Sequence, residues 1–179
     1  SPKLAGLDWD NLAERMTPEL RVDISPEWVV AQFRARYPAM TPHELLWAAV
    51  TAGRSWRGQA IEAELRAAAD APTWVYQCDF ADPARPEQGA PHTMDIALVF
   101  GTTAHGSSLS GDSPAARAAS AAMMRAFAGF ARTGTADWPQ YRTDRRATMI
   151  FDAVSRIEND PRRWERELFA RVPYVQPGT

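Results

Sequence analysis

The feature that most constrains this sequence is a series of helix-start signals, each made of a capping residue followed by proline. The side chain of a capping residue accepts a hydrogen bond from a free backbone N–H of the first turn, and proline suits the next position because it has no N–H to leave unpaired. The five pairs are Thr17-Pro18, Ser25-Pro26, Thr41-Pro42, Ser113-Pro114 and Asp160-Pro161. They predict a chain rich in helices, with a helix beginning at each pair.

The residues after these pairs predict how far each helix runs. Apolar side chains recur at helical spacing in these segments, and a proline or glycine follows most of them. Helices are expected after Ser25 up to Pro38, after Thr41 with Glu44 completing a capping box, over residues 56–69, over residues 114–133 with Gly134 as the stop, and after Asp160.

Only two segments predict β-strands. Residues 73–80 are aromatic and β-branched, and residues 147–152 form a short, mostly apolar run. Residues 82–91 and 102–112 are expected to be loops, and residues 172–179 an extended tail. Helices interleaved with strands indicate an α/β architecture. Because a two-stranded sheet is marginally stable alone, the sequence suggests that a larger sheet extends beyond these residues.

Composition excludes several classes of protein. The 179 residues carry 20 Lys and Arg against 22 Asp and Glu, so the basic excess expected of a nucleic-acid-binding protein is absent. No apolar run approaches the roughly 20 residues of a membrane-spanning helix, so no membrane contact is expected. The single cysteine, Cys78, rules out an internal disulfide, and with scattered histidines it predicts neither a metal site nor a cofactor.

Three histidines are available for chemistry, and their contexts differ. His43 falls in the first turn of an expected helix, and His105 lies in a Gly/Ser-rich loop, so both are expected to have surface or packing roles. His92 follows a strand and a proline-rich loop. Because catalytic residues concentrate in loops that strand ends position, His92 is the strongest candidate.

Residues 89–101 read Gly-Ala-Pro-His-Thr-Met-Asp-Ile-Ala-Leu-Val-Phe-Gly. This stretch resembles the histidine motif of the type-B carboxylesterases, the cholinesterase-like branch of the α/β-hydrolases. Further segments resemble that family in the same order along the chain: residues 74–80, 127–134, 138–141, 146–149 and 159–166. The resemblance covers about residues 25–170. It implies that residues 1–179 are the C-terminal part of an α/β-hydrolase fold, helix-rich with the last strands of the central sheet.

The resemblance also implies a reaction. His92 would be the histidine of a Ser-His-Glu/Asp triad, taking a proton from the serine hydroxyl and passing it to the leaving alcohol of a carboxylic ester. The implied partners are a small-molecule ester substrate and the missing N-terminal part of the same protein. The chain alone is expected to be inactive because it lacks the nucleophile.

The other triad members are not found in these residues. Two stretches approach the Gly-x-Ser-x-Gly nucleophile motif, at residues 106–110 and 53–57, but each lacks the second glycine and neither follows an expected strand. The family's acid would fall at or just before Ser1. Asp8 and Asp10 lie close to that point, but their surroundings resemble the helix after the acid, so they are not assigned.

Other residues receive structural interpretations. Cys78 is expected to be a small buried apolar residue, and Asp95 to lie at the start of a short helix rather than to orient the loop. Trp47, Trp56, Trp74 and Phe100 could line an acyl or alcohol pocket, but core packing is the expected role of each. Met123 and Met124 are assigned to a core-facing helix rather than to a cofactor site. Ala97 departs from the family's proline, which alters the turn after His92.

Two alternatives to an esterase stay open. One is a cholinesterase-like binding scaffold whose triad has degenerated, and the other is an isolated helical module without activity. A bacterial cytoplasmic location is expected from the unpaired cysteine, with secretion left open because the N-terminal part is absent.

Overall fold

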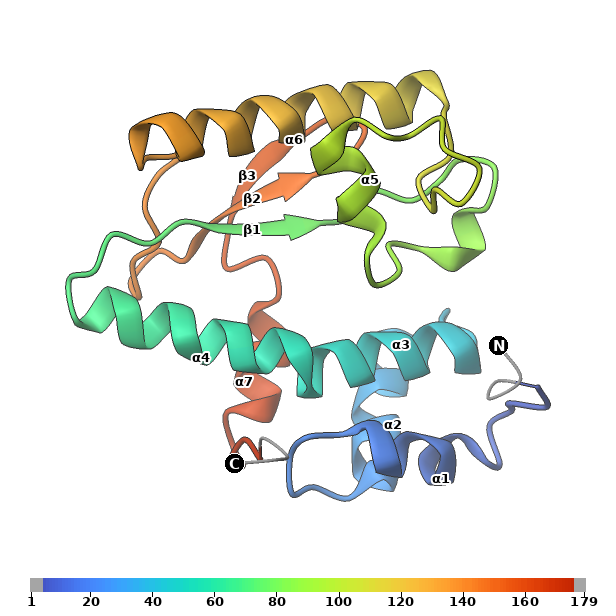
Figure 1. The fold of residues 1–179 in the computed structure, drawn as a ribbon. Helices are drawn as coiled ribbons and strands as arrows, with labels where there is room; N and C mark the ends of the chain where they lie inside the picture. The colour runs from blue at the N-terminus through green and yellow to red at the C-terminus, as the bar shows by residue number, and fades with distance from the viewer. Residues whose placement is uncertain (1–4, 176–179) are drawn as a thin grey trace. The chain divides into compact units, whose positions relative to one another are not determined.

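The computed structural model describes residues 5–175 and divides the chain into two compact units (Figure 1). We call them the helical unit, residues 5–62 and 162–175, and the sheet unit, Ala63–Pro161. One helix, α4 (Ser55–Ala68), contributes residues to both units.

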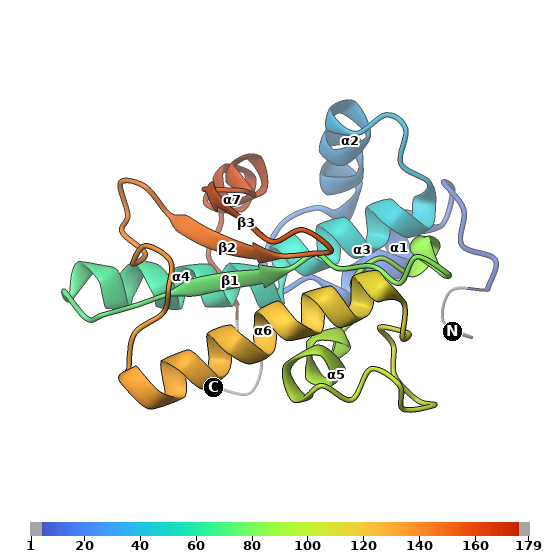
Figure 2. The same cartoon turned by 90° about the horizontal axis from the view of Figure 1, so that it is seen from above.

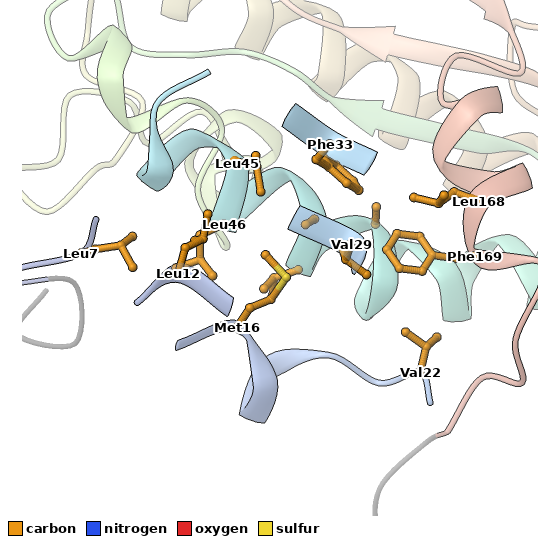
Figure 3. Packing of buried hydrophobic residues seen from close by; sticks show 13 residues of the cluster. Leu7, Leu12, Met16, Val22, Val29, Phe33, Leu45, Leu46, Leu168 and Phe169 are labelled. Carbon is orange, nitrogen blue, oxygen red and sulfur yellow. The ribbon is translucent and has the colours of Figure 1, made fainter. Parts of the chain in front are cut away.

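The helical unit is built from short helices. They are α1 (Leu12–Met16), the 3₁₀ helix η2 (Thr17–Glu19), α2 (Pro26–Arg36), α3 (Pro42–Gly53), the first part of α4, and α7 (Arg163–Phe169). Figure 3 shows apolar side chains from α1, α2, α3 and α7 pointing toward one another. Phe33 is fully buried in this core, with its ring 5.0 Å from that of Trp164 and 6.3 Å from that of Phe169.

The sheet unit contains a three-stranded mixed sheet in the order β1 (Val75–Cys78), β2 (Ala147–Phe151) and β3 (Arg156–Asn159). β1 is parallel to β2, with Val75 opposite Thr148, and β2 is antiparallel to β3, with Ala147 opposite Asn159. Between β1 and β2 the chain forms the 3₁₀ helix η3 (Pro86–Gln88), α5 (Met94–Phe100) and α6 (Pro114–Thr133).

The long helix α6 runs beside the strands, and α5 lies next to it in both views (Figures 1 and 2). Small residues on one side of α6 allow this close approach, since Ala116 and Ala119 are fully buried. The same side carries Met123, which packs in one apolar cluster with Phe80 and Phe151. This cluster is the core of the sheet unit.

Three of the five predicted caps are confirmed. Ser25 accepts a hydrogen bond from the N–H of Trp28, and Ser113 accepts one from Ala116. Thr41 and Glu44 form the predicted capping box, with the Glu44 carboxylate 2.7 Å from the N–H of Thr41.

The other two caps were wrong. Thr17 caps no helix start; it continues the chain from α1 into η2, and its hydroxyl donates to the carbonyl of Ala13. Asp160 has a positive φ of 52°, and the residue that precedes α7 is Arg162.

The expected number of strands was also wrong. The predicted strands 73–80 and 147–152 correspond to β1 and β2, but β3 was not predicted. The tail pairs through one antiparallel bridge, Val22 to Tyr174, while residues 176–179 lie outside the described part of the chain.

Core packing was wrong for two of the aromatic residues to which it was assigned. Trp47 and Phe100 are 53% and 72% exposed, and Met124 is exposed on α6 while its neighbour Met123 is buried. Helical spacing explains this last difference, because adjacent residues of a helix point about 100° apart.

Candidate catalytic site

His92 lies in the turn that connects the long loop after β1 to α5. Its side chain is exposed, whereas Met94, two residues later, is buried in the core of the sheet unit. The N–H of Met94 donates to the carbonyl of Pro91 across this turn, at 3.0 Å. His92 is therefore presented to solvent by a turn whose next residues are anchored.

The backbone beside His92 has an unusual conformation. Thr93, which precedes the first residue of α5, has a φ of 71°, in the left-handed region that non-glycine residues seldom adopt. Its side chain makes no capping hydrogen bond that would compensate. Strained residues of this kind cluster at functional sites, where the surrounding fold holds them in place.

The first turn of α5 is joined to β1 by a side-chain hydrogen bond. The Tyr76 hydroxyl donates to the Asp95 carboxylate at 3.2 Å. The Tyr76 ring makes edge-on contacts with Phe127 and Phe151, which lie on α6 and β2. Partial burial, reinforced by the Asp95 charge, raises the pKa of Tyr76 to about 12, so the hydroxyl keeps its proton at neutral pH. Asp95 lies at the start of a short helix as predicted, and it also ties that helix to the sheet.

The His92 ring itself has no hydrogen-bond partner among residues 5–175. The structure brings no serine or carboxylate of this part of the chain to it. The acid predicted at or before Ser1 lies outside the described residues. Asp8, which was not assigned, accepts backbone hydrogen bonds from Asp10 and Asn11 within its own turn.

Neither near-match to the nucleophile motif has the required setting. Ser55 begins α4 directly after α3, and no strand precedes it. Ser107 lies in the loop after α5, where its hydroxyl is 2.9 Å from Nδ1 of His105 and its N–H also points to that nitrogen. This contact lies within an exposed turn. No carboxylate of residues 5–175 forms a hydrogen bond with His105 there.

The remaining candidates occupy structural positions. His43 is exposed in the first turn of α3, as expected. Cys78 is half-buried on β1, and burial raises the pKa of its thiol to about 11, which makes it a poor nucleophile at neutral pH.

Sequence reasoning did not single out Tyr76, Asp82 or Arg85 as residues that shape this loop. Asp82 is 4% exposed although it is charged, and it pairs with Arg85 three residues later. An Asp-Pro-x-Arg stretch in a loop is a recognisable turn signal, because an aspartate side chain readily bonds backbone N–H groups two residues on. Tyr76 carries no comparable signal, since its partner Asp95 is distant in the sequence.

No group of three or more His, Cys, Asp or Glu side chains within residues 5–175 is arranged to hold a metal ion. Within the same range, none of the helices combines the length and the apolar character needed to cross a membrane.

Comparison with known proteins finds similarity to esterases, although not through a family model. No family model matches the sequence. A para-nitrobenzyl esterase of Bacillus subtilis is 31% identical over 110 residues, covering 54% of this chain and 21% of the esterase. The matched segment therefore spans about a fifth of the length of this relative.

Solved structures resemble a larger part of the chain. The carboxylesterase EST55 of Geobacillus stearothermophilus matches with a TM-score of 0.76 and 25% identity, covering 94% of this chain and 36% of the carboxylesterase. An esterase of Clostridium hathewayi described as hydrolysing aliphatic aromatic polyesters matches with a TM-score of 0.59 and 23% identity, covering 94% of this chain and 34% of the esterase. These matches confirm the predicted resemblance to carboxylesterases with the α/β-hydrolase fold, over a part of their length only.

Proposed function

We propose that this chain is the C-terminal portion of a carboxylesterase, and that His92 is the histidine of its Ser-His-Glu/Asp triad. The observation that carries the proposal is the match to EST55, which extends over 94% of this chain but only 36% of that enzyme. The missing portion would supply the serine, the acid and the backbone N–H groups that hold the oxyanion. It would also supply further strands, which makes β1, β2 and β3 the last strands of a larger sheet.

The position of His92 supports this role. A general base must reach both the serine hydroxyl and the leaving group, so its ring must be accessible and its backbone fixed. The His92 ring is exposed, and the turn that bears it is flanked by buried Met94 and by the Tyr76–Asp95 hydrogen bond. With no partner inside residues 5–175, the imidazole is free to pair with groups of the missing portion.

The proposed substrate is a small carboxylic ester. A location in the cytoplasm is part of the same proposal, supported by the low cysteine content of these residues, in which Cys78 has no second cysteine to pair with.

The test is ester hydrolysis by the intact protein that contains this chain. Replacing His92 by Ala should lower kcat for a p-nitrophenyl ester by about a thousandfold or more, since a triad that lacks its base keeps only binding and oxyanion stabilisation. His105→Ala is the matched control, because His105 is also an exposed loop histidine of the sheet unit and should turn over normally.

Near-normal turnover of the His92→Ala protein would show that this residue is not the general base. An intact wild-type protein without esterase activity would favour the binding scaffold instead.

A further inference from the structure

The two loops on either side of α5 are joined by one arginine. Residues 81–93 precede α5 and carry His92, and residues 102–112 follow it. Arg85 in the first loop donates from Nε to the Asp82 carboxylate at 2.9 Å, and from Nη2 to the carbonyl of Leu109 in the second loop at 3.2 Å. A single guanidinium therefore links the turn at Asp82 to the loop of residues 102–112, which we call the far loop.

The far loop closes on the same carboxylate through its backbone. A Cβ atom placed on Gly111 would lie 2.9 Å from both carboxylate oxygens of Asp82. Gly111 also has a φ of 60°, which glycine adopts without strain. Asp82 accepts a further hydrogen bond from the N–H of Ala84, and its pKa is lowered by this bond and by Arg85, so it stays ionised at neutral pH.

The far loop is in turn fixed to α6. The buried Thr103 hydroxyl donates to Asp112 at 2.7 Å, and Arg117 on α6 pairs with the other carboxylate oxygen at 3.0 Å. The loop after α5 thus has its own anchor to a long helix. Arg85 connects the His92 loop to that anchored segment.

We propose that Arg85, held by Asp82, is a positioning residue that fixes the loop bearing His92 through its bond to the 102–112 loop. The proposal rests on the catalytic role proposed above for His92. Successive turns transmit the constraint: the N–H of Gln88 donates to the carbonyl of Arg85, and that of Gly89 to Pro86. Because no group of residues 5–175 holds the His92 ring, these backbone anchors and buried Met94 set its position.

Such an arginine affects catalysis more than overall stability. Its side chain is 38% exposed, and ion pairs of this exposure add little to the free energy of unfolding. Catalysis is more sensitive, because a displacement of about 1 Å in a reacting group can cost about a hundredfold in rate.

The experiment compares Arg85→Ala and Arg85→Lys with the wild-type intact protein. Arg142→Ala is the control, since Arg142 and its partner Asp144 are both about three-quarters exposed in the same unit. Stoichiometric labelling with a fluorophosphonate counts the reactive serines, so kcat can be expressed per working site. The substrate is a p-nitrophenyl ester.

The expected result is an unchanged number of reactive sites in Arg85→Ala, with kcat per site lowered about tenfold and KM within about twofold of wild type. Lysine can pair with Asp82 but cannot also reach Leu109, so Arg85→Lys should lose about threefold in kcat per site. Arg142→Ala should match wild type.

A kcat per site within about twofold of wild type in Arg85→Ala overturns the proposal, as does a loss explained wholly by fewer reactive sites. If Arg85→Ala fails to fold, Arg85→Lys decides by the same criterion. His92→Ala, measured alongside, separates the two proposals. Its inactivity together with normal Arg85 variants rejects only the positioning role, whereas its normal turnover rejects the catalytic assignment.

Discussion

The two units differ in how completely they bury their apolar side chains. Each has a core with fully buried aromatic residues, such as Phe33 in the helical unit and Phe80 in the sheet unit. The exposed large apolar side chains, however, lie mostly in the sheet unit. They are Leu65, Tyr76, Ile96, Phe100, Met124, Phe130, Val154 and Ile157, against Trp9, Trp47 and Val175 in the helical unit.

This difference shows which unit forms a closed structure. In the helical unit the buried carboxylate of Glu165 is paired, since it accepts a hydrogen bond from Tyr37 at 2.9 Å and lies 3.7 Å from Arg162. The sheet unit, which bears His92, leaves one edge of β1 without a strand partner among residues 5–175. Exposed apolar side chains together with an unpaired strand edge are what a portion of a larger sheet would show.

The largest effects on the free energy of unfolding are expected from truncating one buried aromatic side chain in each core. Phe33→Ala and Phe151→Ala should each lower the free energy of unfolding by about 3–5 kcal/mol, because both side chains are almost fully buried. Only Phe151 contacts Tyr76, so only Phe151→Ala should also lower kcat per site. Urea denaturation and site-titrated kinetics of the intact protein test this. Equal losses of kcat per site in both variants would contradict the expectation that only the core of the sheet unit supports the position of His92.

Trp47→Ala provides the control for these core substitutions. Its side chain is 53% exposed, so the free energy of unfolding should change by less than about 1 kcal/mol.

A smaller effect is expected from the ionisation of Cys78, which reports on the sheet unit alone. Burial raises the pKa of its thiol from 9.0 to about 11, so at pH 8 the thiolate should be about a hundredfold scarcer than in an unfolded chain. Reaction with a disulfide reagent such as Ellman's reagent should be correspondingly slow. Phe151→Ala should accelerate it, whereas Phe33→Ala should not; a fast reaction in the wild-type protein would contradict the burial.

The same shift fixes a pH dependence of stability. Because the folded state holds the Cys78 proton more tightly than the unfolded state, its contribution to stability is fully present below pH 9 and is lost as the pH rises from about 9 to about 11. Tyr76, with a pKa raised to about 12, acts in the same direction at higher pH. Replacing Cys78 by Ala should remove the lower part of this decline in a denaturation series.

The smallest effects are expected at the helix caps, one in each unit. Thr41→Ala removes the two hydrogen bonds of the Thr41 hydroxyl, one from the N–H of Glu44 and one to the Glu44 carboxylate, whereas Ser113→Ala removes one hydrogen bond at 3.1 Å. Both should cost about 1 kcal/mol in the free energy of unfolding, with the loss at Thr41 the larger. Urea denaturation of the two variants measures the order, and a larger loss at Ser113 would reverse it.

Sequence patterns predicted the features of the fold that depend on local interactions. The caps at Ser25, Thr41 and Ser113 bond to backbone groups three residues away, so their signals are complete within one turn. β3 was missed because it reads Arg-Ile-Glu-Asn and is mostly exposed, which leaves no apolar alternation to detect. Its strand conformation depends on pairing with β2, a contact that no local pattern encodes.

The candidate site was predictable to a similar extent. The motif around His92 identified the loop and the expected start of α5 at Asp95. The bond from Tyr76 to Asp95 and the bond from Arg85 to Leu109 join residues 19 and 24 positions apart, and only the fold brings them together. Exposure of Phe100 likewise follows from what packs against α5 rather than from its own apolar character.

The most direct test of the central claim is the structure of the intact protein after a fluorophosphonate has modified its nucleophile. We expect the His92 ring to lie within hydrogen-bond reach, about 3 Å, of an oxygen of the phosphonylated serine. We also expect β1 to pair along its free edge with a strand from outside residues 1–179. A His92 ring more than about 10 Å from the modified serine would place it beyond even a water-mediated contact, and would contradict the assignment.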